Sequence, residues 1–167
     1  MILSSGNTVL AHYDPNAETQ VSVDTSSYGL GTVLEQQQKD KTRQPVAYQS
    51  RSLSPCEQQY AKIEKEALAI TWACKCFNSY ILGKPFKIQM DYRPLIYLLS
   101  SQEDFNHLPP HIQCFRMWLM KYSFSIIHVP GKNLNCADTL SRAPKNEPKP
   151  EDYIFEEEGK LYVNQVF

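Results

Sequence analysis

The feature that most constrains the fold is an apolar stripe in the middle of the chain. Its residues recur at alternating spacings of three and four, the period of one helix face. They are Tyr60, Ile63, Ala67, Ile70, Cys74, Phe77 and Ile81. Ser54, Pro55 and Glu57 match a capping box with proline at the first helical position, and Gly83 and Pro85 follow the stripe. These patterns predict one continuous helix from residue 55 to about residue 81.

Strand patterns lie on both sides of this helix. Before it, residues 20–26, 31–36 and 44–49 predict three short strands separated by turns, which favours an antiparallel meander. After it, residues 86–90 and 124–129 predict two more strands, and residues 94–99, 111–121 and 137–141 predict helical segments. A strand that returns to its sheet through a helix usually lies parallel to its neighbour. The order βββαβαβα therefore predicts an α/β fold with a mixed sheet and flanking helices.

Composition is typical of a globular chain with a distinct C-terminal part. Of the 167 residues, 42% are hydrophobic and 21% are charged, which fits one domain plus a tail. Residues 8–143 form the predicted domain. Residues 144–152 carry three prolines among charged residues and predict an extended linker. Residues 153–167 suggest two short strands around a turn, which would be marginally stable alone.

Charge, cysteines and hydropathy disfavour several classes of protein. The net charge of −1 gives no indication of a nucleic-acid partner by itself. The five cysteines show no C-x-x-C spacing, so neither a disulfide framework nor a structural zinc site is expected. No apolar run approaches the ~20 residues of a membrane span, and the N-terminus lacks a secretory signal pattern. We therefore expect no membrane partner and a cytoplasmic location.

Four acidic residues stand where phosphoryl chemistry would use them. They are Asp24 in the first strand, Glu66 on the long helix, Asp91 at the end of the fourth strand and Asp138 in the last helix. Carboxylate oxygens suit Mg²⁺, and two such ions could activate a water and stabilise a leaving oxygen. Each acid alone also has an ordinary alternative as a turn, cap or solvated residue. Asp24 is the least ordinary, because aspartate is depleted within strands.

Four motifs in this order resemble the ribonuclease H domain of gypsy-type long-terminal-repeat retrotransposon polyproteins. They are VLAHYDPN, VSVDTSSYGLGTVLEQ, the stretch from PVAYQSRSLSPCEQQYA to MDYRPLIYLL, and IIHVPGKNLNCADTLSRAP. The resemblance covers roughly residues 8–143 and implies a ribonuclease H-like fold with a five-stranded mixed sheet. In that family the domain follows the reverse transcriptase and precedes the integrase. Residues 153–167 resemble the start of the segment that leads into the integrase.

The resemblance also implies an activity, which is cleavage of the RNA strand of RNA–DNA hybrids. It matches Asp24, Glu66, Asp91 and Asp138 to the catalytic acids that hold two Mg²⁺ ions, with Mn²⁺ as a substitute. The implied partners are an RNA–DNA hybrid and the reverse transcriptase and integrase parts of the same polyprotein. The replication cycle of such elements adds the nucleus as a second expected location.

Two departures from the family pattern concern the site. The family usually has Thr-Asp-His at the end of the fourth strand, whereas Met90 and Tyr92 flank Asp91 here, which removes a polar neighbour. Relatives often carry a catalytic histidine in the loop before the last aspartate, and this loop has none. His128 precedes the loop and is predicted to be an ordinary strand residue.

Hybrid recognition in this fold is expected to use backbone shape and 2′-hydroxyl groups. The candidate substrate contacts are Ser26, Ser27, Tyr28, Arg51, Arg93, Lys132 and Arg142. Each has an ordinary alternative as a turn residue or a solvated charge. The leading hypothesis is thus a retrotransposon-derived ribonuclease H. The alternatives are an inactive binding module and a truncated relic without independent function.

Overall fold

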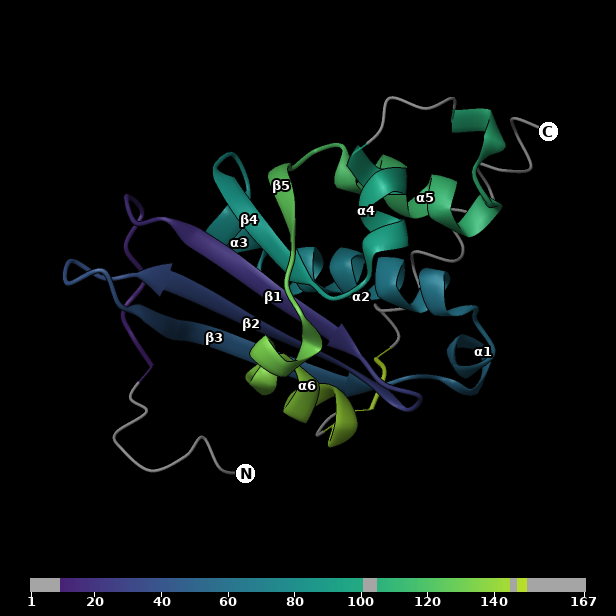
Figure 1. Cartoon of the computed structure of the whole chain (residues 1–167), viewed down its shortest axis with the longest axis horizontal. Coiled ribbons are helices and arrows are strands. Elements are labelled where there is room, and N and C mark those ends of the chain that lie inside the picture. The colour runs from purple at the N-terminus through teal and green to yellow at the C-terminus, as the bar shows by residue number, and fades with distance from the viewer. Residues whose placement is uncertain (1–9, 101–104, 145–146, 150–167) are drawn as a thin grey trace.

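A five-stranded mixed sheet forms the centre of the molecule (Figure 1). The computed structural model describes residues 10–100, 105–144 and 147–149. Strands β1 (Thr19–Thr25), β2 (Gly29–Gln37) and β3 (Arg43–Ser52) form an antiparallel meander. Strands β4 (Pro85–Met90) and β5 (Ser123–His128) add to β1 in parallel, which gives the order β3-β2-β1-β4-β5. The predicted five-stranded mixed sheet is confirmed.

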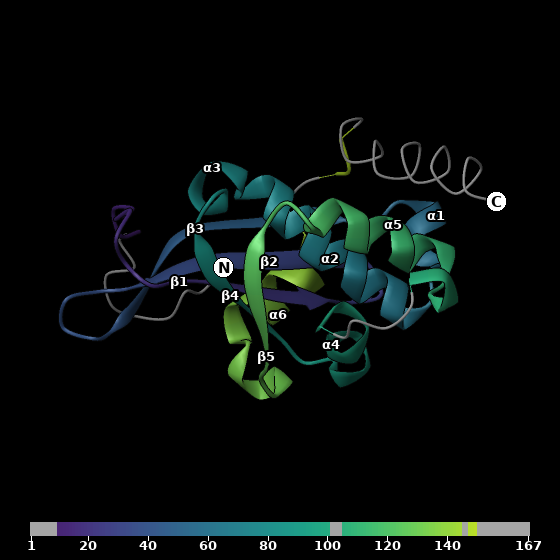
Figure 2. The ribbon, with the colours of Figure 1, turned by 90° about the horizontal axis from the view of Figure 1, so that it is seen from above.

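Six α-helices and two short 3₁₀ turns surround this sheet in the described part of the chain. The helices are α1 (Pro55–Gln58), α2 (Lys62–Cys76), α3 (Asn78–Ile81), α4 (Arg93–Ser100), α5 (Pro110–Leu119) and α6 (Asn135–Arg142). The 3₁₀ turns are η1 (Phe105–His107) and η2 (Gly131–Asn133). Helices α2 and α5 lie side by side in both views (Figures 1 and 2).

The two faces of the sheet carry different side chains because successive residues of a strand point in opposite directions. Val21, Val23 and Leu30 are buried in the main hydrophobic core, to which α2 and α5 contribute. The alternate positions on the other face include Gly29 and Gly31, which face α6. Figure 1 shows α6 in front of the sheet and α2 behind it. The sheet is therefore covered on both faces.

The predicted continuous helix from residue 55 to about residue 81 is wrong, because three separate helices occupy this stretch. Ser54 and Glu57 form the expected capping box, but α1 ends at Gln58. A new helix then begins, and the Glu64 side chain accepts a hydrogen bond from the Ala61 backbone N–H at 3.0 Å. The apolar period continues through the break, so the pattern alone did not reveal it. Glu66 lies on the second of these helices, α2, where it contacts Thr25 at the end of β1.

The predicted domain boundaries are only partly covered by the described residues. Residues 8 and 9, most of the predicted linker at 144–152 and all of the segment at 153–167 lie outside them. Those predictions therefore stay predictions. Within the described ranges, no helix combines the length and the apolar character that crossing a bilayer requires.

Candidate active site

The end of β1 connects the helices on the two faces of the sheet. Asp24 points towards α6, where the Ser141 hydroxyl lies 3.0 Å from Asp24 Oδ2. The next residue, Thr25, points to the opposite face and donates a hydrogen bond to Glu66 Oε1 of α2 at 3.0 Å. Two consecutive residues of one strand thus bring α2 and α6 to the same edge of the sheet.

Helix α6 approaches the sheet closely because β2 has glycines beneath it. A Cβ atom added to Gly31 would lie 2.6 Å from the Ser141 backbone nitrogen, and one on Gly29 would lie 2.5 Å from the Ser141 carbonyl oxygen. Both separations are too short for ordinary packing, so a side chain at either glycine would push α6 away. The glycines therefore set the distance between β1 and the residues of α6.

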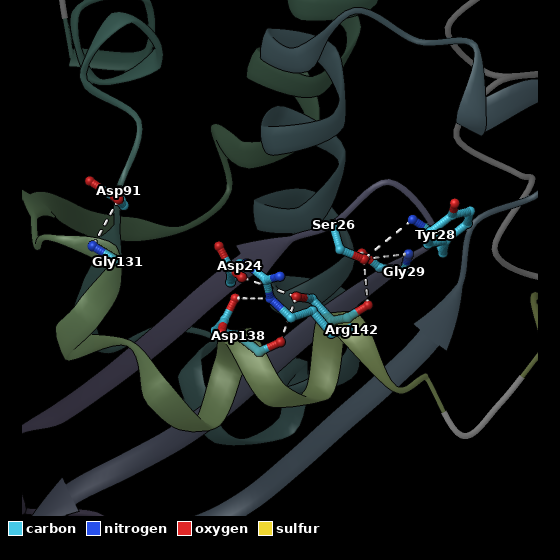
Figure 3. Close-up of polar contacts among 9 residues, drawn as sticks. Asp24, Ser26, Tyr28, Gly29, Asp91, Gly131, Asp138 and Arg142 are labelled. Atoms are coloured by element: carbon cyan, nitrogen blue, oxygen red, sulfur yellow. Dashed lines mark hydrogen bonds and ion pairs between the residues drawn. The ribbon is translucent and has the colours of Figure 1, made fainter.

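The turn between β1 and β2 is held by Ser26 (Figure 3). Its hydroxyl oxygen accepts hydrogen bonds from the backbone N–H groups of Tyr28 at 3.2 Å and Gly29 at 3.1 Å. The same hydroxyl donates to the Ser141 carbonyl oxygen at 2.6 Å. Ser26 therefore fixes the turn against α6. Ser27 and Tyr28 are exposed, and the Tyr28 side chain is available to a ligand.

Two carboxyl groups at this edge have raised pKa values. Burial raises the pKa of Asp24 to about 6, and the neighbouring charge of Asp138 adds to the rise, whereas the Ser141 hydrogen bond opposes it. Burial raises the pKa of Glu66 to about 7, and the charges of Asp24 and Asp91 add to this effect. Burial and mutual repulsion thus make it unfavourable for these carboxyl groups to be ionised at the same time. A bound divalent cation would offset this repulsion.

Asp91 follows β4 and contacts residues at the end of β5. Its Oδ2 atom accepts a hydrogen bond from the Gly131 backbone N–H at 2.8 Å (Figure 3). Its Oδ1 atom lies 3.0 Å from His128 Nε2. Asp91 thus has two polar partners despite Met90 and Tyr92 beside it. Sequence reasoning missed the role of His128. The parallel pairing of Met90 with His128 is the signal that places this ring beside Asp91.

Asp138 lies in α6 and is held by its own helix. Arg142, one turn later, donates from Nε to Asp138 Oδ1 at 2.7 Å (Figure 3). The guanidinium group is largely exposed, with 73% of its side-chain surface accessible. Arg142 therefore neutralises Asp138 in the absence of another cation.

The four predicted acids gather at one edge, where the charge of Asp138 acts on Asp24 and the charges of Asp24 and Asp91 act on Glu66. Among the residues that the structure describes, no three His, Cys, Asp or Glu side chains are placed to hold one metal ion together. Asp91 is held by Gly131 and His128, and Asp138 is held by Arg142. The donor chemistry nevertheless fits Mg²⁺, since all four side chains offer carboxylate oxygens.

One predicted substrate contact is corrected by the structure. Arg51 is 2% exposed and forms a two-pronged ion pair with Glu57, with N–O distances of 3.0 and 2.7 Å. It joins β3 to α1 and does not face solvent as a phosphate contact must. Arg93 at the start of α4 and Lys132 in η2 are exposed, so they remain candidates.

An open groove of about 600 Å³ lies beside the acids, between the β1–β2 turn and α2. Its lining residues are Thr25, Ser26, Ser27, Tyr28, Lys62, Lys65 and Arg142. Lys62 and Lys65 were not predicted as contacts. The signal that could have found them is their place on the first turn of the helix that carries Glu66. Three cations and an exposed tyrosine make this groove suitable for a phosphate backbone.

A mixed five-stranded sheet covered by helices, with carboxylates at one edge, is an α/β architecture that comparison with known proteins places in a family. The family described as the RNase H-like domain found in reverse transcriptase matches residues 14–122. The chain therefore belongs to this family. Curated proteins with similar sequences are retrotransposon polyproteins, which agrees with the predicted origin. The gypsy-type assignment stays a prediction.

Two curated relatives illustrate this origin. The retrovirus-related Pol polyprotein from transposon 297 of Drosophila melanogaster is 38% identical over 122 residues, which cover 73% of this chain and 11% of the relative. The transposon Tf2-3 polyprotein of Schizosaccharomyces pombe is 31% identical over 161 residues, which cover 95% of this chain and 12% of the relative. The chain thus spans about a ninth of the length of these relatives.

Solved structures show that the fold is ribonuclease H-like. RNase H1 from Halobacterium salinarum NRC-1 has a TM-score of 0.54 at 17% identity, with 74% of this chain and 93% of that chain covered. The foamy viral protease-reverse transcriptase in complex with RNA/DNA hybrid has a TM-score of 0.51 at 15% identity, with 72% and 16% covered. The predicted ribonuclease H-like fold is confirmed.

Proposed function

We propose that this chain hydrolyses the RNA strand of RNA–DNA hybrids with Mg²⁺, for which Mn²⁺ can substitute. The observation that carries the proposal is the convergence of Asp24 and Glu66, whose pKa values are raised to about 6 and about 7, at the edge that also presents Asp91 and Asp138. Bound Mg²⁺ would supply a nucleophilic water at neutral pH and offset charge on the phosphate. The family membership and the hybrid complex of the foamy viral relative support the substrate class.

The protein's own residues position the reaction. The carboxylates of Asp24, Glu66, Asp91 and Asp138 would hold the cations, while Thr25 and Ser141 orient the first two through hydrogen bonds. Attack of water on phosphorus forms a new P–O bond and breaks the bond to the 3′ oxygen. The products are a 5′-phosphate and a 3′-hydroxyl. Contacts to 2′-hydroxyl groups would distinguish RNA from DNA, and the exposed Ser27 and Tyr28 are placed to make them.

A labelled RNA–DNA hybrid tests this proposal. Purified chain should cleave the RNA strand with Mg²⁺ or Mn²⁺ and not with chelator, and Asp24→Asn should abolish cleavage. The matched control is Asp40→Asn, because Asp40 is an exposed aspartate in the β2–β3 turn. Absence of metal-dependent cleavage by the folded wild-type chain would refute the enzyme.

A second candidate is a hybrid-binding module without turnover. The pairing of Asp138 with Arg142 and the hold on Asp91 by Gly131 and His128 favour it, because both keep the acids apart. Metal-independent binding of the hybrid without cleavage would establish this candidate. The retrotransposon relatives also make the polymerase and integrase parts of a polyprotein the proposed partners of either form.

A further inference from the structure

We propose that Lys62 binds a backbone phosphate of the nucleic acid beside the acid site and that Tyr92 positions it there. The proposal rests on the proposed function and adds a further contact to the same site. It concerns two residues on different elements, α2 and the segment that follows β4, which the sequence did not connect.

The geometry joins these two elements across the site. Lys62 Nζ lies 5.3 Å from the centroid of the Tyr92 ring, within the range of a cation–π contact. Tyr92 directly follows Asp91, and Lys62 is four residues before Glu66 on α2. The Tyr92 ring is half-buried and packs against the hydrophobic core, so its position is fixed. The ring therefore links the helix that carries Glu66 to the residue that follows Asp91.

The contact with the Tyr92 ring leaves the positive charge of Lys62 free to bind a phosphate. An aromatic ring attracts the ammonium group without neutralising it, whereas the carboxylate partner of Arg142 does neutralise a cation in the same groove. Lys62 is exposed and lines the groove together with Lys65. Its charge also lowers the pKa of Glu66 against the effect of burial, which places the ammonium close to that carboxyl group.

Tyr92 is the position where the chain departs from the family pattern beside Asp91. The resemblance to the family predicts histidine at this position. A histidine that gains a proton would repel the ammonium group, whereas the tyrosine ring attracts it at any pH below the ionisation of its phenol. We therefore assign the departure from the family pattern a role in orienting Lys62.

The test is the salt dependence of hybrid binding, measured by fluorescence anisotropy. All variants carry Asp24→Asn, so that the hybrid stays intact with Mg²⁺ present. Removing one phosphate contact should reduce the slope of log affinity against log salt by roughly 0.7–0.9. Lys62→Ala should show this reduction. Tyr92→Ala should weaken hybrid binding. In a chain that already carries Lys62→Ala, Tyr92→Ala should cause little further loss of affinity. Tyr92→Phe should bind the hybrid as tightly as the Asp24→Asn parent chain.

Two matched controls accompany these variants. Lys121→Ala removes a lysine that also lies over a ring, Trp118, but near the start of β5, away from Asp91. Tyr97→Ala removes an exposed tyrosine of α4. Both should leave the slope unchanged, and thermal unfolding should verify that every variant is folded.

The outcomes separate this inference from the proposed function. An unchanged slope for Lys62→Ala, or full additivity of the Tyr92 and Lys62 effects, overturns the inference even if the wild-type chain cleaves the hybrid and Asp24→Asn abolishes that cleavage. A reduced slope without any cleavage by the wild-type chain supports the phosphate contact and refutes the nuclease. Failure of the chain to bind hybrid at low salt overturns both.

Discussion

The hydroxyl oxygen of Ser141 lies 3.0 Å from Asp24 Oδ2, and this contact joins two residues that are 117 positions apart. The same hydroxyl lies 2.8 Å from the backbone carbonyl oxygen of Asp138. Helix α6 therefore supplies one of the predicted acids and also orients another. A mutation in α6 can disturb the site without removing any carboxylate.

The first prediction concerns Ser141→Ala. The lost hydrogen bond favoured the ionised form of Asp24, so the pKa of Asp24 should rise above its value of about 6. Cleavage should then fall about fivefold at pH 6 and recover by pH 8.5, where the carboxylate is ionised again. The measurement is the pH profile of kcat/KM. Ser123→Ala, at an exposed position at the start of β5, is the control, and an equal loss at both pH values would contradict the explanation.

The second prediction concerns Gly31→Ala. The added methyl group would meet the backbone of α6, so we expect a loss of about 1–3 kcal/mol in the free energy of unfolding together with weaker Mg²⁺ binding. Gly83→Ala is a control of comparable instability, because Gly83 has a φ of +76° but no neighbour within 4 Å. Its cost is about 1 kcal/mol of backbone strain. Urea unfolding measures the stability of both variants, and calorimetric titration measures their affinity for Mg²⁺. Only Gly31→Ala should weaken Mg²⁺ binding.

The third prediction concerns the buried pair of Arg51 and Glu57. Glu57→Gln leaves a buried guanidinium group without its ionic partner, which should cost about 3 kcal/mol in the free energy of unfolding. The exposed pair of Arg43 and Glu18 is the comparison, and Arg43→Met should cost less than about 1 kcal/mol. Urea unfolding measures both. A Glu57→Gln chain of wild-type stability would show that the ion pair with Glu57 does not stabilise the fold.

The fourth prediction concerns stability against pH without metal. Asp24 and Glu66 have folded-state pKa values of about 6 and about 7, above the value of about 4 expected for the unfolded chain. The folded chain thus retains protons that the unfolded chain releases, so the contribution of these groups to stability falls as pH rises from about 4 to above 7. Because Mg²⁺ competes with these protons, it should raise the Tm more at pH 8 than at pH 5.

Thermal unfolding with Mg²⁺ or chelator at both pH values checks this sign. In a chain with Asp24→Asn and Glu66→Gln, the rise in Tm caused by Mg²⁺ should be nearly the same at pH 5 and pH 8, because neither replacement titrates. A wild-type chain whose response to Mg²⁺ is the same at pH 5 and pH 8 would show that these two carboxyl groups do not take part in binding the ion.

The order of strands and helices followed from the sequence because periodicity and turn residues act locally. The parallel direction of β4 followed as well, because a helical crossover favours it, but its place beside β1 is known only from the structure. The break between α1 and α2 did not follow from the sequence. The apolar period stays in phase across Gln59–Ala61, and the contacts that accompany the break include the pair of Arg51 with Glu57, which links a helix to a strand.

For the site, the sequence named the acids but not their partners. The four acids were matched through the resemblance to the family, since their spacing along the chain does not bring them together by itself. Arg51 was assigned to the surface because a charged residue is usually solvated, and its burial depends on a partner that also serves a helix cap. The contact of His128 with Asp91 depends on strand register, which no local pattern records.

The close packing of α6 over Gly29 and Gly31 has a consequence for any shortened version of the protein. The family match ends at residue 122, whereas α6 begins at Asn135. A fragment that ends at residue 122 would retain strands β1 to β4 and lack β5. It would also lack Asp138, Ser141 and the helix that packs on Gly29 and Gly31. During synthesis on the ribosome β5, which ends at His128, emerges before α6, which begins at Asn135, so all five strands of the sheet are present in the nascent chain before the edge that carries the four acids can be complete. The candidate site is therefore assembled only when α6, the C-terminal helix among the described residues, packs on the sheet.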